Sequence, residues 1–381
     1  MSNKSLNLPG AHKAPSILRS EFSLLFGAVT AVLFLSFDQT WLADLTTPVK
    51  YGLLFIWLFC TMVWLAFSVV RHADSLAVLL GEPYGTLILT VSVITIEVFM
   101  ISAVMLHGDN NPTLARDTLF SVLMIVLNGI VGVTLLVGAL RHKEQAYNLK
   151  GASAYLSVII PLAGLGIILP RYTTTAPGGE VTTLMAVYLI AMAITLYGVF
   201  LSIQTMRHRN YFEQPATTES EISHKDHGNL VVRSLGFHAL LLPLTMLPIV
   251  LLSKKMAILV DHGIEVLRAP QALGGFMVAI LVLSPEAVAA GRAALANQLQ
   301  RTMNITLGSA LSTIGLTIPA VLGISLVTGK TIVLGLEPAE IFLLLFTLLV
   351  AMVNFSSERT NVLHGFVHLV LFATYVVLIF D

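Results

Sequence analysis

Two glutamates lie in the middle of apolar segments that are long enough to cross a membrane. Glu97 lies within residues 85–106, and Glu286 lies within residues 274–296. A carboxylate at the centre of a bilayer costs about 2.5 to 3.5 kcal/mol on insertion scales, so residues of this kind usually form ion or proton sites. The alternative for each is a neutral, hydrogen-bonded residue that holds helices together. The two glutamates are therefore the first candidates for function.

The surroundings of the two glutamates indicate an internal repeat. Gly85 and Gly274 precede Glu97 and Glu286 at the same distance, and a hydroxyl residue, Thr95 or Ser284, lies two positions before each glutamate. Few other residues match. A charge at the same place in two apolar spans is typical of transporter halves that share an origin. The sequence therefore predicts two related halves.

Two carboxylates in the middle of a membrane can exchange a proton for a metal ion. Desolvation raises the pKa of a carboxylic acid, whereas a nearby cation lowers it, so protons and cations compete for the same oxygens. If the site opens alternately to the two sides of the membrane, this competition couples the uphill movement of one ion to the downhill movement of the other. The pair Glu97 and Glu286 thus predicts a cation/proton antiporter.

The segment after Glu286 adds candidate oxygen ligands. Asn304, Ser309 and Ser312 interrupt the apolar start of the following helix. Amide, hydroxyl and carbonyl oxygens suit hard ions such as Ca²⁺ or Na⁺, and no cysteine or histidine cluster here suits zinc. The alternative is that the small residues serve close helix packing. We expect these three side chains to join the cation site.

Backbone oxygens could contribute to the same site. Pro285 directly precedes Glu286, and Gly274 and Gly275 lie at the start of the same span. Proline and glycine are the residues at which membrane helices are most often interrupted. We expect them to break this helix and to free carbonyl groups for coordination.

Composition places the chain among integral membrane proteins. Hydrophobic residues make up 56% of the 381 positions and charged residues only 11%. This apolar content exceeds that of soluble domains, and several stretches reach the roughly 20 residues that cross a bilayer. The 21 Lys and Arg balance the 21 Asp and Glu. The expected partners are therefore lipid and transported ions, and neither a nucleic acid nor a cofactor is expected.

The expected fold class is an all-α polytopic membrane protein, with two inverted five-helix repeats and one extra N-terminal helix. Helices are expected because lipid offers no water to satisfy an open backbone. The eleven predicted spans cover residues 22–43, 51–70, 86–106, 118–140, 153–170, 181–203, 231–252, 273–296, 303–327, 338–354 and 360–380.

The distribution of lysine and arginine predicts the orientation. Most of them lie in the N-terminal tail and in the connections 71–85, 141–152, 204–233, 292–302 and 355–359. The positive-inside rule then places the N-terminus in the cytoplasm and the C-terminus outside. The spans of Glu97 and Glu286 would therefore run in opposite directions, as an inverted repeat requires.

The chain is expected to divide into four parts. Residues 1–45 form a cytoplasmic tail and the extra first helix, residues 46–203 the first repeat, residues 204–230 a cytoplasmic linker, and residues 231–381 the second repeat. The polar composition of the linker is typical of a disordered connection. A regulatory, ion-sensing role for the linker is the alternative.

Several segments resemble the bacterial ChaA type of cation/proton antiporter, which belongs to the calcium:cation antiporter superfamily. The resemblance covers nearly the whole chain, including the extra first span and the long connection after the sixth span. The segments that carry it are residues 69–85, the span around Glu97, and residues 283–286, 300–301, 307–310 and 359–363.

The resemblance implies roles for particular residues. In the superfamily an acidic residue in each repeat binds the transported ion, and a Gly-Ser pair follows on the next helix. Glu286 with Gly308 and Ser309 matches this spacing, and in the first half Glu97 is followed by Asn128 at the position expected for the serine. Relatives of this type exchange Na⁺, K⁺ or Ca²⁺ for H⁺ across the bacterial inner membrane. The resemblance also implies that spans two and seven slide against the rest of the protein.

Other ionisable residues have secondary interpretations. Glu82 is a candidate for a proton route, and Asp74 and His238 are expected to line a cytoplasmic vestibule or to reach the interface. His364 and His368 lie four positions apart, but a metal site needs more ligands, so we expect them to pack.

Two other functional classes compete with the antiporter. A membrane-embedded enzyme would use the two glutamates as an acid/base pair or as metal ligands, although no HExxH or nucleotide-binding motif accompanies them. A passive channel would conduct ions without coupling them to protons. Charge counting leaves the cation open, because two carboxylates neutralise one Ca²⁺ or two monovalent ions equally well. The oligomeric state is likewise open.

Overall fold

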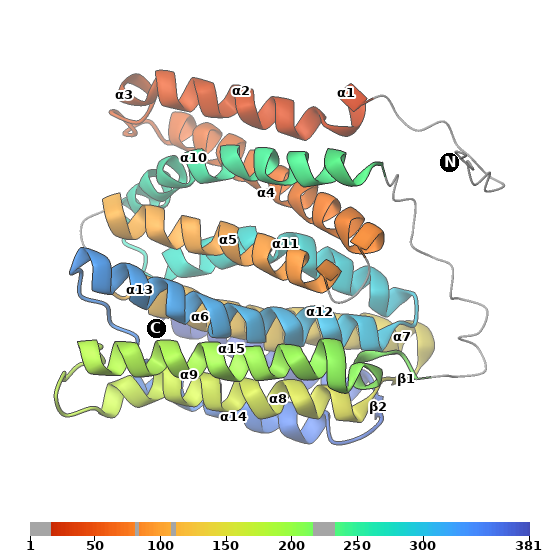
Figure 1. The fold of residues 1–381 in the computed structure, drawn as a ribbon. Coiled ribbons are helices and arrows are strands. Elements are labelled where there is room, and N and C mark those ends of the chain that lie inside the picture. Colours follow the sequence, from red (N-terminus) through yellow and green to blue (C-terminus); the bar gives the residue numbers. More distant parts are fainter. Residues whose placement is uncertain (1–16, 81–83, 108–111, 216–232) are drawn as a thin grey trace.

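The computed structural model describes residues 17–80, 84–107, 112–215 and 233–381, and nearly all of them are helical. The chain passes back and forth along one direction, so the long helices lie side by side with their axes roughly aligned (Figure 1). This arrangement suits a bilayer, because each helix satisfies its own backbone polar groups. The chain is an all-α, multi-pass membrane protein.

The first half contains the extra N-terminal helices and the first set of long helices. Its elements are α1 (Ile17–Ser20), α2 (Phe22–Ser36), α3 (Asp38–Trp41), α4 (Pro48–Leu80), α5 (Tyr84–His107), α6 (Leu114–Met124), the π-helix η1 (Ile125–Ile130), α7 (Val131–His142), β1 (Gln145–Ala146), α8 (Leu149–Ala163), the π-helix η2 (Gly164–Ile168), the 3-10 helix η3 (Leu169–Tyr172), α9 (Thr183–Ser202), the π-helix η4 (Ile203–Arg207) and the 3-10 helix η5 (Arg209–Phe212).

The second half contains the second set. Its elements are α10 (Leu235–Leu267), α11 (Ala272–Leu295), α12 (Leu299–Ser312), the π-helix η7 (Thr313–Thr317), α13 (Ile318–Thr328), α14 (Pro338–Asn354), β2 (Arg359–Thr360) and α15 (Val362–Phe380).

Every predicted span has a helical counterpart. Within the described residues, eight continuous helical segments are long and apolar enough to cross a membrane, and α2 and α14 are shorter apolar helices. The remaining predicted span is α5, whose 24 residues include Glu97.

Short polar residues begin several helices. Asn148 Oδ1 accepts a hydrogen bond from the backbone N–H of Lys150 at 3.1 Å at the start of α8. Thr182 Oγ1 accepts one from the N–H of Met185 at 3.3 Å at the start of α9, and Asn361 caps α15 in the same way. Such caps satisfy N–H groups that a helix start leaves unpaired, and each is worth about 1 kcal/mol.

The two halves repeat the same lengths and the same irregularity. Both α4 and α10 have 33 residues, and both α5 and α11 have 24. The next helical segments, α6–η1–α7 and α12–η7–α13, have 29 and 30 residues, and each contains a π-helix. In Figure 1 α4 runs from left to right, whereas α10 runs from right to left. The halves are therefore inverted with respect to each other, as predicted.

The matched hydroxyl residues before the two glutamates make matched contacts. Thr95 Oγ1 donates to the carbonyl of Val91 at 2.5 Å, and Ser284 Oγ donates to the carbonyl of Ile280 at 2.5 Å. Both hydroxyls thus bond to their own helix one turn back, which is a common way to satisfy serine and threonine inside a helix.

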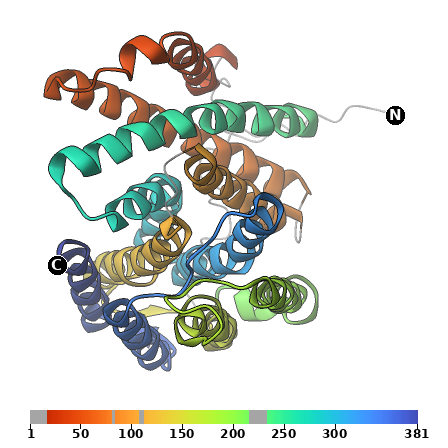
Figure 2. The same ribbon diagram turned by 90° about the vertical axis from the view of Figure 1, so that its left-hand side faces the viewer.

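The helices form two packed groups. Buried apolar residues of α2, α4 and α10 form one core with parts of α5 and α11, and the helices α6–α9 and α12–α15 form a second, larger core. Figures 1 and 2 show α2, α4 and α10 together on one side of the molecule, which we call the α2–α4–α10 layer. The helices α5 and α11, which carry the glutamates, lie between this layer and the larger core.

The described parts of the connections that were predicted to share a side of the membrane lie at one end of the helices. At this end β1 pairs antiparallel with β2, with Gln145 opposite Thr360 and Ala146 opposite Arg359. We call it the β end; it is the right-hand end in Figure 1, whereas the C-terminus lies at the other end.

The expected interruption of α11 is wrong. The helix runs continuously from Ala272 to Leu295 with Pro285 inside it. Gly275 instead serves close packing, because a Cβ atom there would lie 2.7 Å from backbone atoms of Asp117 and Thr118 on α6. The irregular backbone lies in the neighbouring segments, at η1 and η7, and π-helices are often found at functional sites.

The extra N-terminal helices are tied to α10 at the end opposite the β end. Lys255 Nζ forms an ion pair with Asp38 in α3, and the lysine side chain is only 8% exposed. His262 Nε2 lies 3.2 Å from the carbonyl oxygen of Leu45. These contacts fix the start of the chain on the second half of the molecule.

Candidate cation-binding site

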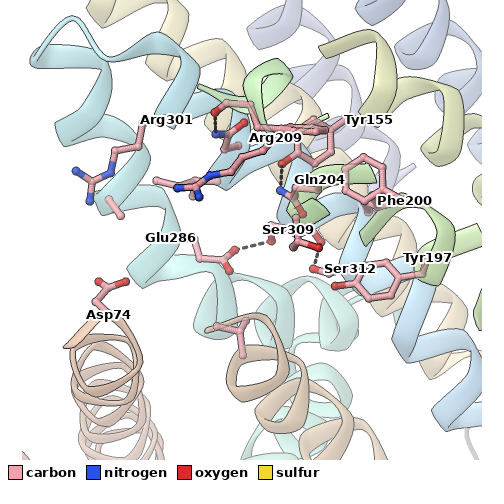
Figure 3. Close-up of a pocket in the computed structure, with 18 of the residues that line it drawn as sticks. Asp74, Tyr155, Tyr197, Phe200, Gln204, Arg209, Glu286, Arg301, Ser309 and Ser312 are labelled. Atoms are coloured by element: carbon pink, nitrogen blue, oxygen red, sulfur yellow. Dashed lines mark hydrogen bonds between the residues drawn. The ribbon is translucent and has the colours of Figure 1, made fainter. Parts of the chain in front are cut away.

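A cavity of about 380 Å³ opens between the helices at the β end. Exposed side chains of Arg209, Glu213 and Arg301 surround its mouth, and Glu286 lies deeper (Figure 3). The residues that line it are Val70, Asp74, Val93, Tyr155, Tyr197, Phe200, Gln204, Thr205, Arg209, Phe212, Glu213, Glu286, Ala289, Arg301, Asn304, Ile305, Gly308, Ser309, Leu311 and Ser312.

Glu286 faces this cavity from α11. Its Oε2 accepts a hydrogen bond from Ser309 Oγ on α12 at 2.5 Å, as Figure 3 shows. Ser312 Oγ donates to the carbonyl oxygen of Ser309 at 3.1 Å and lines the same cavity. The predicted residues Glu286, Ser309 and Ser312 thus lie together, with carboxylate and hydroxyl oxygens that suit a hard cation.

Glu97 is enclosed instead. It is 1% exposed, and it does not belong to the described residues that line the cavity. Its Oε2 accepts a hydrogen bond from Thr313 Oγ1 at 3.0 Å, and its Oε1 accepts one from Thr317 Oγ1 at 3.2 Å. Both carboxylate oxygens are therefore held by hydroxyl groups of η7.

The two glutamates contact the same helical segment from different helices. Ser309, Thr313 and Thr317 follow one another at four-residue spacing on α12–η7, and they bond Glu286 at one turn and Glu97 at the next. Four helical residues rise by about 6 Å. The two carboxylates consequently approach this segment one turn apart along its axis.

Thr313 and Thr317 are the partners that the sequence analysis missed. The sequence carries a detectable signal, because Ser309, Thr313 and Thr317 place three hydroxyl groups at i, i+4 and i+8. Residues at this spacing share a helix face. A search for hydroxyl residues along that face would have found them.

Asn304 lies at the wall of the cavity near its mouth. Its Nδ2 donates to the carbonyl oxygen of Phe212 at 2.7 Å, and its Oδ1 accepts from Gln300 Nε2 at 2.9 Å. Gln204 Nε2 donates to Tyr155 Oη at 2.9 Å on the same wall. Five residues of the predicted linker thus line the cavity: Gln204, Thr205, Arg209, Phe212 and Glu213. Residues 216–230 lie outside the described residues.

Asn128 lies in a different polar cluster. It is fully buried in η1, its Nδ2 donates to Thr347 Oγ1 at 2.9 Å, and its Oδ1 lies 3.2 Å from His368 Nδ1. Among the described residues, no hydrogen bond joins it to either glutamate. His368 packs against Phe355, with ring centroids 5.9 Å apart.

The remaining candidates have the following positions. Asp74 lines the cavity from α4, at the lower left of Figure 3. Glu82 lies outside the described residues. Within the described part of the chain, no group of three or more His, Cys, Asp or Glu side chains is arranged to hold a metal ion. The oxygen atoms beside Glu286 in the cavity lining belong to hydroxyl, amide and carboxylate side chains.

Comparison with known proteins identifies the family. The family model described as "Sodium/calcium exchanger protein" matches residues 50–206 and 237–380. The chain is 39% identical over 374 residues to the sodium-potassium/proton antiporter ChaA of Escherichia coli strain K12, covering 98% of this chain and 100% of that protein. It is also 39% identical over 320 residues to the putative ionic transporter y4hA of Sinorhizobium fredii strain NGR234, covering 82% and 84%.

Solved structures share the fold. The structure of native YfkE superposes with a TM-score of 0.72 at 15% sequence identity, covering 95% of this chain and 99% of that chain. The structure of the H⁺/Ca²⁺ exchanger CAX superposes with a TM-score of 0.62 at 12% identity, covering 94% and 88%. The chain therefore belongs to the sodium/calcium exchanger protein family, as a calcium:cation antiporter of the ChaA type and not as an enzyme.

Proposed function

We propose that this antiporter exports Na⁺, K⁺ or Ca²⁺ from the cytoplasm in exchange for protons, and that Glu97 and Glu286 alternate between protonated and cation-bound forms. The observation that carries this proposal is that the two carboxylates, on α5 and α11, accept hydrogen bonds from successive turns of α12–η7. Carboxylates that converge on one helical segment can share one ion pathway, whereas two separate packing residues would have no reason to converge.

The cavity at the β end supplies the route to Glu286. Its volume of about 380 Å³ is large enough for several water molecules, so a hydrated ion can enter it. Once there, the cation exchanges water for the Glu286 carboxylate and the hydroxyl groups of Ser309 and Ser312. Asn304 lines the route by which the cation enters. A proton on Glu286 removes the negative charge of the carboxylate and so excludes the cation.

Alternating access would exchange the environments of the two glutamates. In the conformation described here Glu286 faces the cavity at the β end and Glu97 is enclosed by Thr313 and Thr317. Because the halves are inverted repeats, the opposite conformation would expose Glu97 to the other end and enclose Glu286. Movement of α4 and α10 against the larger core would produce this exchange.

The β end is the cytoplasmic end under this proposal. Most of the lysine and arginine residues that the structure describes lie in or beside the connections at this end, and positively charged connections are retained in the cytoplasm. The N-terminus would then be cytoplasmic and the C-terminus external, in the inner membrane of a bacterium. The cavity would accept its cation from the cytoplasm.

Monovalent cations are the favoured cargo. The relative from Escherichia coli, at 39% identity over 98% of this chain, is named a sodium-potassium/proton antiporter. A more distant relative from Aphanothece halophytica, at 22% identity over 65% of this chain, is named a Ca²⁺/H⁺ antiporter. A panel of Na⁺, K⁺ and Ca²⁺ in everted vesicles, scored by dissipation of the proton gradient over a range of pH, tests this order.

The decisive experiment replaces the two carboxylates one at a time. Glu97→Gln and Glu286→Gln should each abolish cation-dependent dissipation of the proton gradient in everted vesicles, because an amide cannot exchange a proton for a cation. Glu358→Gln, at an exposed position of the β end, is the matched control and should transport normally. Retained pH-dependent exchange in both test variants would refute the assignment.

Coupling has to be measured separately from conduction. In sealed proteoliposomes an imposed cation gradient should drive protons in the opposite direction to the cation. The side that starts with more cation should therefore become more acidic. An ion flux without proton movement would identify a channel and would overturn the antiport mechanism for these residues.

A further inference from the structure

A buried chain of hydrogen bonds joins the extra N-terminal helices, α4 and α10 at the β end. Glu21 precedes α2, His72 lies on α4 and His238 on α10, and the three residues are 8%, 0% and 2% exposed. His72 Nε2 lies 3.1 Å from Glu21 Oε2, and His72 Nδ1 lies 3.0 Å from His238 Nδ1. Arg71 Nη2 also donates to Glu21 Oε2, at 2.6 Å.

The backbone of Arg233 determines which nitrogens carry protons. Its N–H donates to His238 Nε2 at 3.1 Å, so that nitrogen is an acceptor and the proton of His238 is on Nδ1. His238 Nδ1–H then donates to His72 Nδ1, which leaves the proton of His72 on Nε2, from which it is donated to Glu21. These contacts are satisfied when both histidines are neutral. Arg71 Nη2 also lies 3.2 Å from His72 Nε2, but it donates to Glu21 Oε2 and Ser68 Oγ, which accounts for its two hydrogens.

An additional proton has no place in this chain. On His72 Nδ1 it would face the N–H of His238 across 3.0 Å, and on His238 Nε2 it would face the backbone N–H of Arg233 across 3.1 Å. Either placement turns a donor–acceptor contact into a contact between two donors. The charged groups that act on the pair are Glu21 and Arg71 for both histidines, together with Arg233 for His238. The two arginines oppose an added positive charge, and Glu21 alone favours it.

The hydrogen-bond chain from Glu21 to His238 joins the helices of the α2–α4–α10 layer to one another beside the cavity. His72 and His238 bridge α4 and α10 directly, and Glu21 adds the start of α2. Two positions beyond His72 on the same helix, Asp74 lines the cavity that leads to Glu286. A change in the position of α4 at the β end therefore changes the wall of that cavity.

We propose that Glu21, His72 and His238 form a proton sensor at the β end, which holds the α2–α4–α10 layer in the cavity-open conformation while both histidines are neutral. Protonation of the pair breaks the His72–His238 contact and lowers the population of that conformation. The contact is intact at high pH and is lost as the pH at the β end falls. The consequence for transport rests on the proposed function; the structural change does not.

Intrinsic tryptophan fluorescence measures the structural change independently of transport. The chain has three tryptophans, and all of them lie in or beside the α2–α4–α10 layer: Trp41, Trp57 and Trp64. The Trp64 ring packs on Phe22 of α2 with centroids 5.9 Å apart. Displacement of α2 from α4 therefore changes the surroundings of a reporter that the protein already contains.

The experiment is a fluorescence titration of the purified full-length protein from about pH 8 to about pH 4. The range extends below that of an ordinary histidine because the donor–donor contacts oppose the added proton. The wild type should show a transition. The double variant His72→Gln with His238→Gln should lose it, because glutamine offers a donor and an acceptor and does not titrate. His262→Gln, on the same α10 but at the other end, is the matched control and should keep the transition. A flat wild-type curve, or the same transition in the double variant, would overturn the sensor.

Two further variants make the outcome independent of folding and of the proposed function. Glu21→Gln removes the acidic acceptor while leaving both histidines, and it should move the transition to lower pH, because the group that favours the added proton is weakened. If the pH midpoint of the transition does not move, the hydrogen-bond chain from Glu21 to His238 is contradicted. Glu286→Gln should keep the transition in full even though transport is lost. If that variant still transports, the proposed function fails while the sensor stands.

The sensor also predicts how the rate of transport falls at acid pH. In everted vesicles, where the β end faces the medium, wild-type exchange should fall as the external pH falls, whereas the double histidine variant should keep its rate at acid pH. The cation concentration for half-maximal transport should be the same in both at high pH. An identical fall in rate at acid pH in both proteins would contradict the link between the sensor and the cavity.

Discussion

Glu97 and Glu286 occupy equivalent places in two inverted halves, yet their surroundings differ. Each lies on a 24-residue helix, and a hydroxyl residue two positions earlier bonds back to that helix. Glu286 faces a cavity and is bonded by one serine, whereas Glu97 is enclosed and is bonded by two threonines. The two glutamates share the same local sequence pattern. The helical segment that packs against each one therefore decides whether its carboxylate is open or enclosed.

The source of the difference is the asymmetry between the two π-helical segments. In the second half, α12–η7 supplies hydroxyl partners to both glutamates. In the first half, η1 places Asn128 against Thr347 and His368. The second half thus forms the surface on which both carboxylates rest, while the first half contributes a buried polar cluster to the larger core.

The largest difference is expected in chemical accessibility. A water-soluble carbodiimide should modify Glu286 in everted vesicles and leave Glu97 unmodified, because Glu97 becomes reachable only when the structure opens locally. The expected ratio of labelling is about tenfold or more, which corresponds to an opening free energy of at least ~1.4 kcal/mol. Peptide mass spectrometry measures it. Equal labelling of both residues would remove the distinction between an open and an enclosed carboxylate.

The next effect concerns the enclosed carboxylate. Thr313→Val with Thr317→Val keeps the shape of both side chains and removes both hydrogen bonds to Glu97. A hydrogen bond to a charged group is worth about 1.5–3 kcal/mol, so transport should fall about tenfold or more and the thermal midpoint should drop. Thr306→Val is the control, because its hydroxyl bonds only to backbone carbonyls of its own helix. Normal transport in the double variant would show that Glu97 does not need these partners.

A smaller effect is expected at the open carboxylate. Ser309→Ala removes one hydroxyl from Glu286, but water in the cavity can replace part of the contact. The cation concentration for half-maximal transport should rise by about tenfold or less, in line with one charge-assisted hydrogen bond of ~1.5 kcal/mol. Ser157→Ala, at an exposed position of α8, serves as the control. An effect as large as that of the threonine pair would contradict the difference in burial.

The smallest effect on transport is expected at Asn128. Asn128→Ala leaves Thr347 and His368 without their buried partner, so the free energy of unfolding should fall by about 1–3 kcal/mol. Half-saturation by the cation should not change. Thr347→Val should reproduce the loss of stability. A clear rise in the half-saturating cation concentration for Asn128→Ala alone would return Asn128 to the candidate cation ligands.

The sequence contained enough information for the helices and for the opposite directions of the two spans that carry the glutamates. The placement of Glu97 and Glu286 in apolar spans, together with lysine and arginine in alternate connections, predicted two antiparallel helices, and the halves are indeed inverted. Ser309 was predicted because the pair Gly308 and Ser309 follows Glu286 at the spacing found in the superfamily that the sequence resembles. The structure shows that Ser309 does bond Glu286.

The parts that the sequence analysis missed depend on how helices pack. Thr313 and Thr317 reach Glu97 from the other half of the molecule, a contact that spacing within one half does not predict. Pro285 was expected to break α11, but the helix continues through it, because a proline removes only one hydrogen bond and neighbouring helices hold the rest in place. The close approach of Gly275 to α6 likewise appears only once the helices are packed.

The ion pair between Lys255 and Asp38 gives the extra N-terminal helix a mechanical role. One end of α2 is joined to α4 through Glu21 and His72, and His72 in turn contacts His238 on α10. The chain beyond the other end of α2 is joined to α10 through Asp38. Contacts at both of its ends therefore restrict the movement of α2 relative to α4 and α10. Sliding α10 past its neighbours by a single turn, about 5.4 Å, would break both joints at once. Under the proposed function, the three helices of this layer would move together while these contacts are intact, and the movement would occur at the boundary between the layer and the larger core.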